Sequence, residues 1–460
     1  MTLSDNICAM ATPSGGAIGI IRVSGVGAIC IVDGLFSRDI SAAKSHTMHY
    51  GAFASDASTL LDDVMVGVFR APHTYTGENS VEIYCHGSRY IMSEIMRALI
   101  DAGCRQAEPG EFTRRAFLNG RMDLSQAEAV ADLIAATGKA SHDMALGQLR
   151  GNISSELSRL RDQLLKITSL MELELDFSDH EELEFADRSE LSELACKIQQ
   201  RITQLASSFR TGQAVKQGIP VAIIGKTNVG KSTLLNRLVG EEKAIVSDIH
   251  GTTRDIIEDT IDIHGVTFRF VDTAGLRSTD DVIERIGIER SYAALAKAAI
   301  VLWVIDAEPS AEEIADIKKR TEGKQLIAVV NKSDKQPIDV ADKTASQPAM
   351  SPTLPFTTLA ISALTGDGID HLLDAIYEKA GIPEIGGNDA IITSARHYDS
   401  LQRAADSIAR VIEGLNAGIP GDLLSEDLRQ CLADLAEITG GGITPTEVLN
   451  NIFTHFCVGK

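Results

Sequence analysis

Gly225-Lys-Thr-Asn-Val-Gly-Lys-Ser232 is a phosphate-binding loop of the form G-x-x-x-x-G-K-[ST]. It follows the apolar strand predicted at 219–224 and opens a helix predicted to start near Lys231. The two glycines let backbone N–H groups face phosphates, while Lys231 places a cation on the β and γ oxygens. The Ser232 hydroxyl is suited to Mg²⁺. This stretch therefore predicts a doubly wound, parallel α/β nucleotide-binding domain.

A second motif, Asn331-Lys-Ser-Asp334, indicates which base is bound. The Asp334 carboxylate can accept from N1–H and the 2-amino group of guanine, whereas adenine would leave it unpaired. Ser362-Ala-Leu364 follows a strand predicted at 356–361 and is placed to direct a backbone N–H at guanine O6. The nucleotide is therefore predicted to be GTP.

Two switch segments complete the set. Thr253, in Gly251-Thr-Thr-Arg-Asp255, is predicted to bind Mg²⁺ and sense the γ-phosphate. Asp272-Thr-Ala-Gly275 is predicted to be the second switch. The residues predicted to bind GTP are Asn228, Val229, Gly230, Lys231, Ser232, Thr233, Ser247, Asp248, Ile249, His250, Gly251, Thr252, Thr253, Asp272, Thr273, Ala274, Gly275, Asn331, Lys332, Asp334, Ser362, Ala363 and Leu364.

Hydrolysis needs a group that holds the attacking water, and Leu276 occupies the position where many GTPases carry glutamine. Glu284 is the favoured substitute, although spacing alone does not choose it over Asp280 or Asp281. Lys231 supplies one catalytic cation. The side-chain carbonyl of Asn228, with backbone oxygens of the first switch, could hold a K⁺ ion between the phosphates, where an arginine finger usually stands.

The 460 residues suggest about three domains, and 44% hydrophobic content supports sizeable cores. No apolar run reaches the roughly 18 residues of a membrane span, and no secretion signal is visible. Seven cysteines without a C-x-x-C pair argue against a zinc site or a disulfide framework. We therefore expect a cytoplasmic protein with no membrane partner.

The net charge of −21 is opposite to that of an autonomous nucleic-acid binder. DNA is not expected as a partner, and any RNA contact must be local or shared with a basic protein. The acidic stretch 171–185 alternates acids with Leu and Phe, so we interpret it as a solvated helix end and loop.

The pattern along the chain predicts a discontinuous helical domain into which the GTPase domain is inserted. The predicted order is an α+β domain at 1–121, a first helical segment at 122–218, the GTPase domain at 219–382 and a second helical segment at 383–460. Within them we predict strands at 17–23, 64–69 and 81–85 and helices at 90–102, 391–415, 423–438 and 445–456.

Several longer motifs resemble one family from end to end. They are ATPSGGAIGIIRVSG at 11–25, YTGENSVEIYCHG at 75–87, PGEFTRRAFLNGRMDLSQAEAVADLI at 109–134, DTAGLR with ERIGIER at 272–290, and the terminal FCVGK. They are similar to the MnmE (TrmE) family of bacterial tRNA modification GTPases. The resemblance implies an N-terminal domain that binds folate and forms a homodimer.

The resemblance also implies a reaction. Members act with the flavoprotein MnmG, as a heterotetramer, to install a C5 (carboxymethyl)aminomethyl group on the wobble uridine, U34, of certain tRNAs. The one-carbon unit would come from a tetrahydrofolate derivative, in the 5-formyl or 5,10-methylene form. GTP hydrolysis would depend on K⁺ and on the approach of two GTPase domains.

By motif position, the resemblance implies four folate-binding residues: Arg22, Glu82, Arg121 and Lys460. Arg121 stands where the family commonly has lysine, and a guanidinium can still pair with the folate carboxylate. Without the resemblance, simpler interpretations are favoured: Arg22 as an edge-strand charge, Glu82 as a solvent-facing residue that alternates with Val81 and Ile83, and Arg121 as a surface residue near a helix start. His86 is interpreted as a structural histidine, since no set of ligands at metal spacing accompanies it.

For K⁺, the resemblance points to Asn228, Ser247, Ile249 and Thr252, with Ser247 in place of the usual threonine. Glu284 matches the catalytic glutamate of the family.

The last residues also carry a prediction. The terminal sequence is a poor prenylation box because Gly459 is not aliphatic. Apolar residues up to Phe456 should dock, and the resemblance places the tail beside the folate site. Cys457 is then a candidate catalytic nucleophile or redox-sensitive thiol, with its thiolate favoured by Lys460.

Two other functional classes stay open. A ribosome- or RNA-assembly GTPase would share the core motifs but should carry a basic RNA-binding appendage. A nucleotide-gated scaffold would take no part in chemistry, and neither folate binding nor loss of modified uridine would follow from it.

Overall fold

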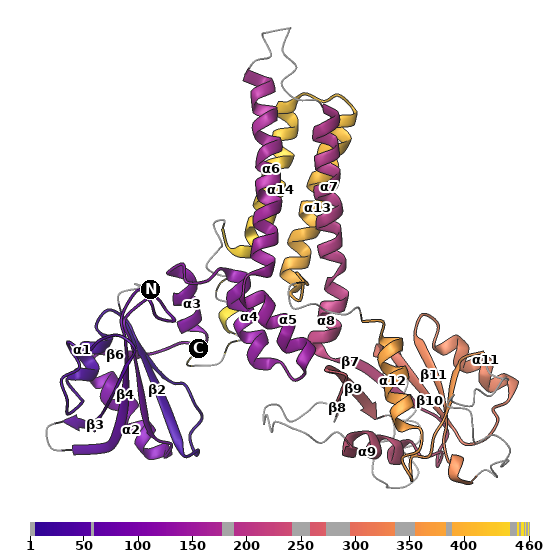
Figure 1. Ribbon diagram of the computed structural model, residues 1–460, viewed down its shortest axis with the longest axis horizontal. Coiled ribbons are helices and arrows are strands. Elements are labelled where there is room, and N and C mark those ends of the chain that lie inside the picture. The colour runs from indigo at the N-terminus through magenta and orange to yellow at the C-terminus, as the bar shows by residue number, and fades with distance from the viewer. Residues whose placement is uncertain are drawn as a thin grey trace, which may run out of the picture. The chain divides into compact units, whose positions relative to one another are not determined.

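The computed structural model describes residues 5–56, 59–176, 188–241, 258–272, 295–335, 355–382 and 389–441, together with 449, 452–454, 456 and 459. The chain divides into two compact units (Figure 1). Unit 1 comprises 1–134, 148–206 and 396–460, and unit 2 comprises 135–147 and 207–395.

Unit 1 begins with a six-stranded sheet of order β3-β4-β5-β2-β1-β6. Its neighbouring strands are antiparallel except for the parallel pair β1 and β6. The strands are β1 (Asn6–Met10), β2 (Ile18–Ser24), β3 (Thr47–Asp56), β4 (Thr59–Phe69), β5 (Ser80–His86) and β6 (Cys104–Gln106), and the helices are α1 (Ala28–Asp33), α2 (Arg89–Asp101) and α3 (Glu111–Leu118).

The sheet separates apolar from polar positions by simple alternation. Ile21, Val23, Val81 and Ile83 are buried in one core with residues of α1 and α2. Their neighbours in β2 and β5, among them Arg22 and Glu82, therefore lie on the opposite face of the sheet. The strands and α2 confirm the predicted α+β fold, whereas β1, β3 and β6 were not foreseen.

The helical region of unit 1 contains four long helices that run side by side (Figure 1). They are α6 (Asn152–Asp176), α7 (Arg188–Ser207), α13 (Ala395–Asn416) and α14 (Gly421–Thr439), with the shorter α4 (Leu124–Ala135) at one end. An Arg201–Glu156 ion pair joins α7 to α6, and Arg403 Nε lies 3.1 Å from Asp434 Oδ1 between α13 and α14. The helical domain is thus built from two distant segments of sequence.

Unit 2 contains the predicted doubly wound sheet, of order β12-β11-β10-β7-β9-β8. All neighbours are parallel except β8 and β9. Every residue of β10 is buried, as expected for a central strand covered on both faces. The elements are α5 (Lys139–Leu149), α8 (Phe209–Gln217), β7 (Ile219–Ile224), α9 (Lys231–Glu241), β8 (Glu258–Ile263), β9 (Val266–Asp272), β10 (Ile300–Ile305), α11 (Ala311–Arg320), β11 (Gln325–Val330), the 3₁₀ turn η1 (Ser333–Lys335), β12 (Thr357–Ala360) and α12 (Ile369–Ala380).

The predicted helix over 391–415 starts later than expected, because α13 begins at Ala395. Two residues just before α13 are bound by α8 and by Ser208, which precedes α8. The Ile392 N–H donates to Ser208 Oγ at 3.0 Å, and Gln213 Nε2 donates to the Thr393 carbonyl at 2.7 Å. These contacts use the backbone groups that a helix would need.

Most of α5 and all of α8 lie in unit 2, although the sequence placed them in the first helical segment. The four domain boundaries remain predictions. Of the acidic stretch 171–185, only the end of α6 falls within the described residues. Among the helices described, none is both long and apolar enough to cross a membrane.

Candidate functional site

The phosphate loop connects β7 to α9 at the carboxyl edge of the parallel strands in unit 2. Gly225 has φ 151°, and a Cβ there would lie 2.2 Å from the Val304 carbonyl oxygen. Gly230 has φ 98°, and its Cβ would lie 2.2 Å from Asn331 Nδ2. Both positions therefore require glycine, for conformation and for space.

The first residues of α9 present the groups expected to meet phosphate. Ser232 and Thr233 are exposed, and the amino end of the helix carries the positive end of its dipole. Lys231 Nζ donates to the carbonyls of Gly225 at 2.9 Å and Lys226 at 2.7 Å, so it lies over the loop. A cation, backbone N–H groups and hydroxyls thus converge as an anion-binding site requires.

Asn331 braces this loop to the predicted base-binding loop. Its side chain is buried, with Nδ2 donating to the Val229 carbonyl at 2.8 Å and Oδ1 accepting from the Ala363 N–H at 2.9 Å. One amide therefore fixes the spacing between the two loops.

The neighbouring Lys332 makes a second connection. Its Nζ donates to the Asn228 carbonyl at 2.8 Å and to Asp306 Oδ2 at 2.7 Å. The hydrogen bond from Lys332 lowers the pKa of Asp306. Asn228 itself has φ 63°, a left-handed conformation that asparagine tolerates better than most residues.

The predicted base-recognition groups also meet in space. Asp334 Oδ1 accepts from Ser362 Oγ at 2.7 Å, while Ala363 is buried and Leu364 is exposed. The Ser362 hydroxyl orients the carboxylate that would bind guanine. Two of the predicted GTP-binding loops, at 331–334 and 362–364, are therefore brought to the phosphate loop.

The predicted switch residues fall mainly outside the described residues. The backbone of Asp272 pairs with Ile223 at the end of β9, which places it at the same sheet edge. The others lie outside the part of the chain that the structure describes: Ser247, Asp248, Ile249, His250, Gly251, Thr252, Thr253, Thr273, Ala274, Gly275 and Glu284.

In unit 1, Arg22 and Glu82 lie directly opposite each other on β2 and β5. Arg22 Nε and Nη2 both donate to Glu82 Oε1, at 3.0 and 2.8 Å. The guanidinium carbon lies 5.8 Å from the ring centre of Tyr75 and 5.7 Å from that of Phe112. A planar cation beside two aromatic rings is suited to a planar or anionic ligand.

Two tyrosines border this pair. Tyr84 Oη donates to Glu82 Oε2 at 2.7 Å, and this bond raises the pKa of Tyr84 to about 12. Burial raises the pKa of Tyr75, whose hydroxyl lies 2.8 Å from Thr113 Oγ1. Both phenols therefore stay protonated at neutral pH and can act as hydrogen-bond donors.

Arg121 and Gly459 lie in the same region. Arg121 Nε donates to the Thr74 carbonyl at 3.0 Å, next to the Tyr75 that faces Arg22. The Gly459 carbonyl accepts from Arg22 Nη1 at 3.2 Å. Arg22 and Arg121 thus both lie against the segment 74–75, Glu82 pairs with Arg22, and Gly459 contacts Arg22. Cys457 and Lys460 lie outside the described residues.

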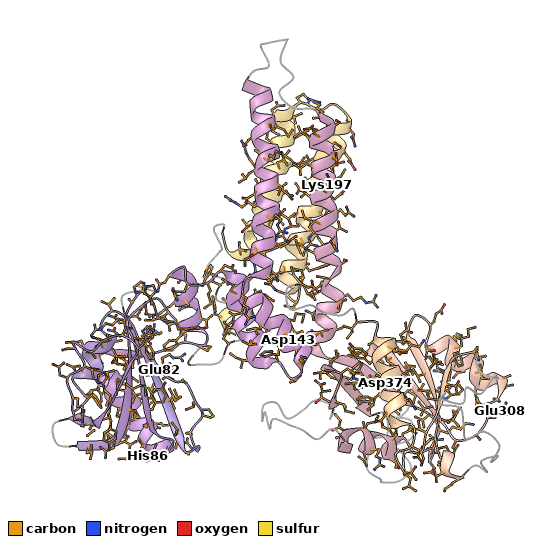
Figure 2. All side chains as sticks on the ribbon, viewed as in Figure 1. Glu82, His86, Asp143, Lys197, Glu308 and Asp374 are labelled. Carbon is orange, nitrogen blue, oxygen red and sulfur yellow. The ribbon has the colours of Figure 1, made fainter. Side chains whose placement is uncertain are left out.

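Glu82 and His86, both on β5, are labelled in Figure 2. His86 Nδ1 lies 2.8 Å from Asp62 Oδ1, and its backbone N–H donates to the other oxygen of the same carboxylate. It is a satisfied surface histidine, as the sequence indicated. Within the described part of the chain, no group of three or more metal-ligating side chains occurs.

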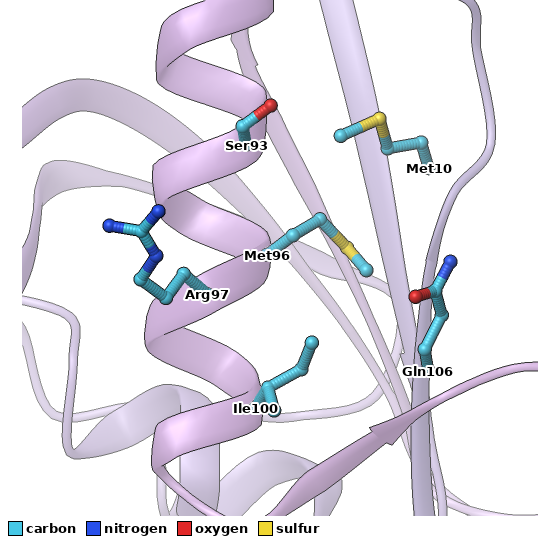
Figure 3. A pocket seen from close by; sticks show the side chains of 6 residues that line it. All are labelled: Met10, Ser93, Met96, Arg97, Ile100 and Gln106. Atoms are coloured by element: carbon cyan, nitrogen blue, oxygen red, sulfur yellow. The ribbon is translucent and has the colours of Figure 1, made fainter.

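A pocket of about 590 Å³ lies between α2 and the strands β1 and β6 (Figure 3). None of the predicted site residues lines it. Arg97 at its rim pairs with Glu94 at 3.2 Å. The lining residues are Met10, Ser93, Met96, Arg97, Ile100 and Gln106.

Comparison with known proteins identifies the family. Residues 6–121 match the family described as "GTP-binding protein TrmE N-terminus", and residues 124–457 match "MnmE helical domain". The chain belongs to the MnmE family. A Phocaeicola vulgatus protein named "tRNA modification GTPase MnmE" is 51% identical, with 100% of both chains covered. One of the same name from Parabacteroides distasonis is 52% identical, with 99% of each chain covered. As an MnmE-family GTPase, the chain hydrolyses GTP.

For this MnmE-family chain, sequence reasoning missed the groups that hold the site residues in place. Asp306 follows the apolar strand β10, and a polar residue at that edge was the available signal. Phe112 lies within the 109–134 motif but carries no polar group that would suggest a site. The Gly459 contact with Arg22 joins residues 437 positions apart, which no local pattern predicts.

Proposed function

We propose that this chain, a GTPase, takes part in tRNA modification together with the flavoprotein MnmG. The product would be a (carboxymethyl)aminomethyl group at C5 of U34, and a tetrahydrofolate derivative would supply the one-carbon unit. The main support is the contact between the Gly459 carbonyl and Arg22, which brings Gly459 to the Arg22–Glu82 pair.

For the folate derivative, the residues present fit the chemistry. Arg22 offers a guanidinium near two aromatic rings, and Glu82 offers an acceptor. Arg121 and Lys460 would pair with the glutamate carboxylates. Cys457 would act there as a nucleophile or redox-sensitive thiol.

For nucleotide hydrolysis, Ser232 and Thr253 would hold Mg²⁺, and Asn228, Ser247, Ile249 and Thr252 would hold K⁺. The exposed Ser232 hydroxyl at the start of α9 fits a magnesium ligand, and Asn228 lies within the phosphate loop. The two ions would neutralise charge that develops on the phosphates. Glu284 would hold the attacking water, and hydrolysis would accompany the approach of two GTPase domains in a homodimer.

Mass analysis of wobble nucleosides from a strain lacking the gene tests this function. The modified uridine should disappear and should return when the wild-type gene is restored. If it persists while ribosome assembly fails, the ribosome-assembly class is correct. If it persists and purified protein binds no tetrahydrofolate, the scaffold class is favoured.

A further inference from the structure

Residues 74–78 form a loop over the polar face of β2. Arg22 and Ser24 are two residues apart on this strand and therefore point to the same side of the sheet. Tyr75 lies beside Arg22, with 5.8 Å between the guanidinium carbon and the ring centre. Thr76 lies beside Ser24, and their hydroxyl oxygens are 2.7 Å apart in a buried contact. The loop is therefore attached to the strand next to the position where it meets Arg22.

Glu78 completes this attachment. Its Oε2 accepts from the Ser24 hydroxyl at 2.8 Å, and its backbone N–H donates to Thr76 Oγ1 at 3.3 Å. Its carbonyl accepts from Thr74 Oγ1 at 2.7 Å, which joins the two ends of the loop. The position of the Glu78 carboxylate therefore determines where the loop lies on β2.

Arg115 of α3 binds the same carboxylate. Its Nη1 lies 3.2 Å from each oxygen of Glu78 and donates to the Asp5 carbonyl at 2.9 Å. Its Nη2 donates to Asp5 Oδ1 at 2.6 Å and to Glu111 Oε1 at 3.1 Å. Arg115 is 2% exposed. One buried guanidinium thus joins the loop, α3 and the residue before β1.

The helix that carries Arg115 supplies two further contacts of the site. The ring centre of Phe112 lies 5.7 Å from the guanidinium carbon of Arg22. The next residue, Thr113, has its Oγ1 2.8 Å from the Tyr75 hydroxyl. Since all three residues belong to α3, the helix and the loop form one arrangement around Arg22.

Buried charges of this kind contribute little to stability, because desolvation offsets much of their attraction. A guanidinium does impose direction, since its donors lie in one plane at fixed angles. Arg115 is satisfied only when Asp5, Glu78 and Glu111 take up one arrangement. Fixed supporting groups of this type are what a binding site needs behind the residues that touch its ligand.

We propose that Arg115 is a positioning residue, which acts through Glu78 to hold the loop 74–78 so that Tyr75 lies beside Arg22 in the geometry that binds the ligand. This inference rests on the proposed function, because the ligand of the Arg22–Glu82 pair is the folate derivative proposed above. Release of the loop would move the Tyr75 ring away from Arg22 and weaken binding.

Three substitutions loosen the loop and leave the ion pair of the site intact. Arg115→Lys keeps the charge but loses the planar group that reaches all its acceptors at once. Glu78→Ala removes the carboxylate. Thr76→Val has nearly the shape of threonine and leaves no charge unpaired, so it is informative even if the other two variants fail to fold. Glu78→Gln, the conservative variant, keeps an acceptor for Arg115 and a polar partner for Ser24.

The probe is 5-formyltetrahydrofolate, titrated into the full-length protein by calorimetry at room temperature. Kd should rise about tenfold or more in the three loosening variants and stay within about threefold of wild type in Glu78→Gln. Matched controls are Arg97→Lys and Glu94→Ala, which alter a surface ion pair on α2 and should leave Kd unchanged. A purely structural role would lower Tm but not change Kd in protein that is folded.

Tyr75 gives a second readout. Burial raises the pKa of its phenol above the ordinary value of about 10. In Arg115→Lys and Glu78→Ala the released loop should expose the phenol, and its pKa should fall back towards about 10. Nuclear magnetic resonance of tyrosine labelled at Cζ measures this ionisation, and the Tyr75 signal is assigned by its absence in Tyr75→Phe.

An unchanged Kd in the loosening variants that fold would overturn the inference, as would an equal loss of binding in Glu78→Gln and Glu78→Ala. A wild-type titration of Tyr75 in Arg115→Lys and Glu78→Ala would also overturn it. If the wild-type protein binds no 5-formyltetrahydrofolate, the proposed function fails instead, and the Tyr75 titration still decides whether Arg115 and Glu78 hold the loop.

Discussion

Asn331 shows how one buried side chain can set the geometry of a binding site. Its amide bonds both the phosphate loop and the base loop. Asn331→Ala would remove two buried hydrogen bonds and leave the buried Ala363 N–H unpaired, at a cost of about 1–3 kcal/mol. We expect GTP affinity to fall roughly tenfold to a hundredfold by calorimetric titration. Gln325→Ala, at an exposed position at the far end of β11, is the matched control. Equal GTP affinity in the two variants would show that the Asn331 amide does not hold the two loops in their binding geometry.

Asn228 carries the prediction about the monovalent ion. Wild-type hydrolysis should be fast in K⁺ and slow in Na⁺ at equal ionic strength. Asn228→Ala should reduce that difference strongly and leave GDP affinity mostly intact, because backbone N–H groups and Lys231 bind the phosphates. Steady-state rates in the two salts measure both effects. Equal wild-type rates in K⁺ and Na⁺ would remove the ion from the proposal.

Cys457 is predicted to act in chemistry rather than in folding. Cys457→Ser should abolish or strongly reduce tRNA modification, while K⁺-stimulated GTP hydrolysis stays near the wild-type rate. Nucleoside mass analysis and a phosphate-release assay measure the two activities. Joint loss of both would indicate a structural role, and full modification by the variant would exclude a chemical one.

At the scale of elements, the packing of α8 against residues 391–393 depends on a missing side chain. A Cβ at Gly212 would lie 2.1 Å from the Ile392 carbonyl oxygen. Gly212→Ala should destabilise unit 2 by about 1–3 kcal/mol through overpacking, as measured by thermal unfolding. Gly240→Ala, in the open on α9, should be neutral or stabilising by up to about 1 kcal/mol, since alanine favours helix. A higher Tm for Gly212→Ala would contradict this prediction and show that residues 391–393 can move to accommodate the added methyl group.

The elements that could be predicted are those whose residues repeat a pattern over a long stretch. The alternation in β2 and β5 predicted the positions of both strands, and the helical periodicity after residue 122 predicted a helical region. Short strands such as β6, with three residues, hold too little pattern to recognise. The start of α13 depended on bonds to Ser208 and Gln213, which are 184 and 180 residues away from their partners. The site was only partly predictable. Local motifs identified Lys231 and Asp334, whereas the hydrogen bonds that hold the loops together, such as those of Asn331, are tertiary contacts that no motif shows.

At the scale of the molecule, Glu128 joins α4 to the distant helix α13 and, through Arg396, to α14. Its Oε1 accepts from Arg396 Nε at 2.9 Å, and its Oε2 lies 2.8 Å from His397 Nε2. Arg396 also donates to the Glu437 and Ile438 carbonyls at the end of α14. Burial alone would raise the pKa of Glu128, but His397 and Arg396 lower it to about 2.

Because the folded pKa is below the unfolded one, this carboxylate stabilises the protein above pH ~4.5 and loses that effect as pH falls towards 2. Glu128→Gln should therefore be less stable at pH 7, by on the order of 3 kcal/mol, with a flatter acid dependence. Urea unfolding at several pH values measures both. Parallel stability curves for variant and wild type between about pH 4.5 and pH 2.5 would contradict the assignment.

The division of unit 1 into three segments has a consequence for synthesis. Residues 396–460 supply α13 and α14, and they emerge from the ribosome only after all of unit 2. A chain that stopped at residue 395 would contain every predicted GTP-binding residue but only half of the four-helix bundle and no tail at Arg22. Only complete translation adds the Gly459 contact to the Arg22–Glu82 pair, so we expect a truncated product to keep the residues for GTP hydrolysis and to lack a contact of the second site.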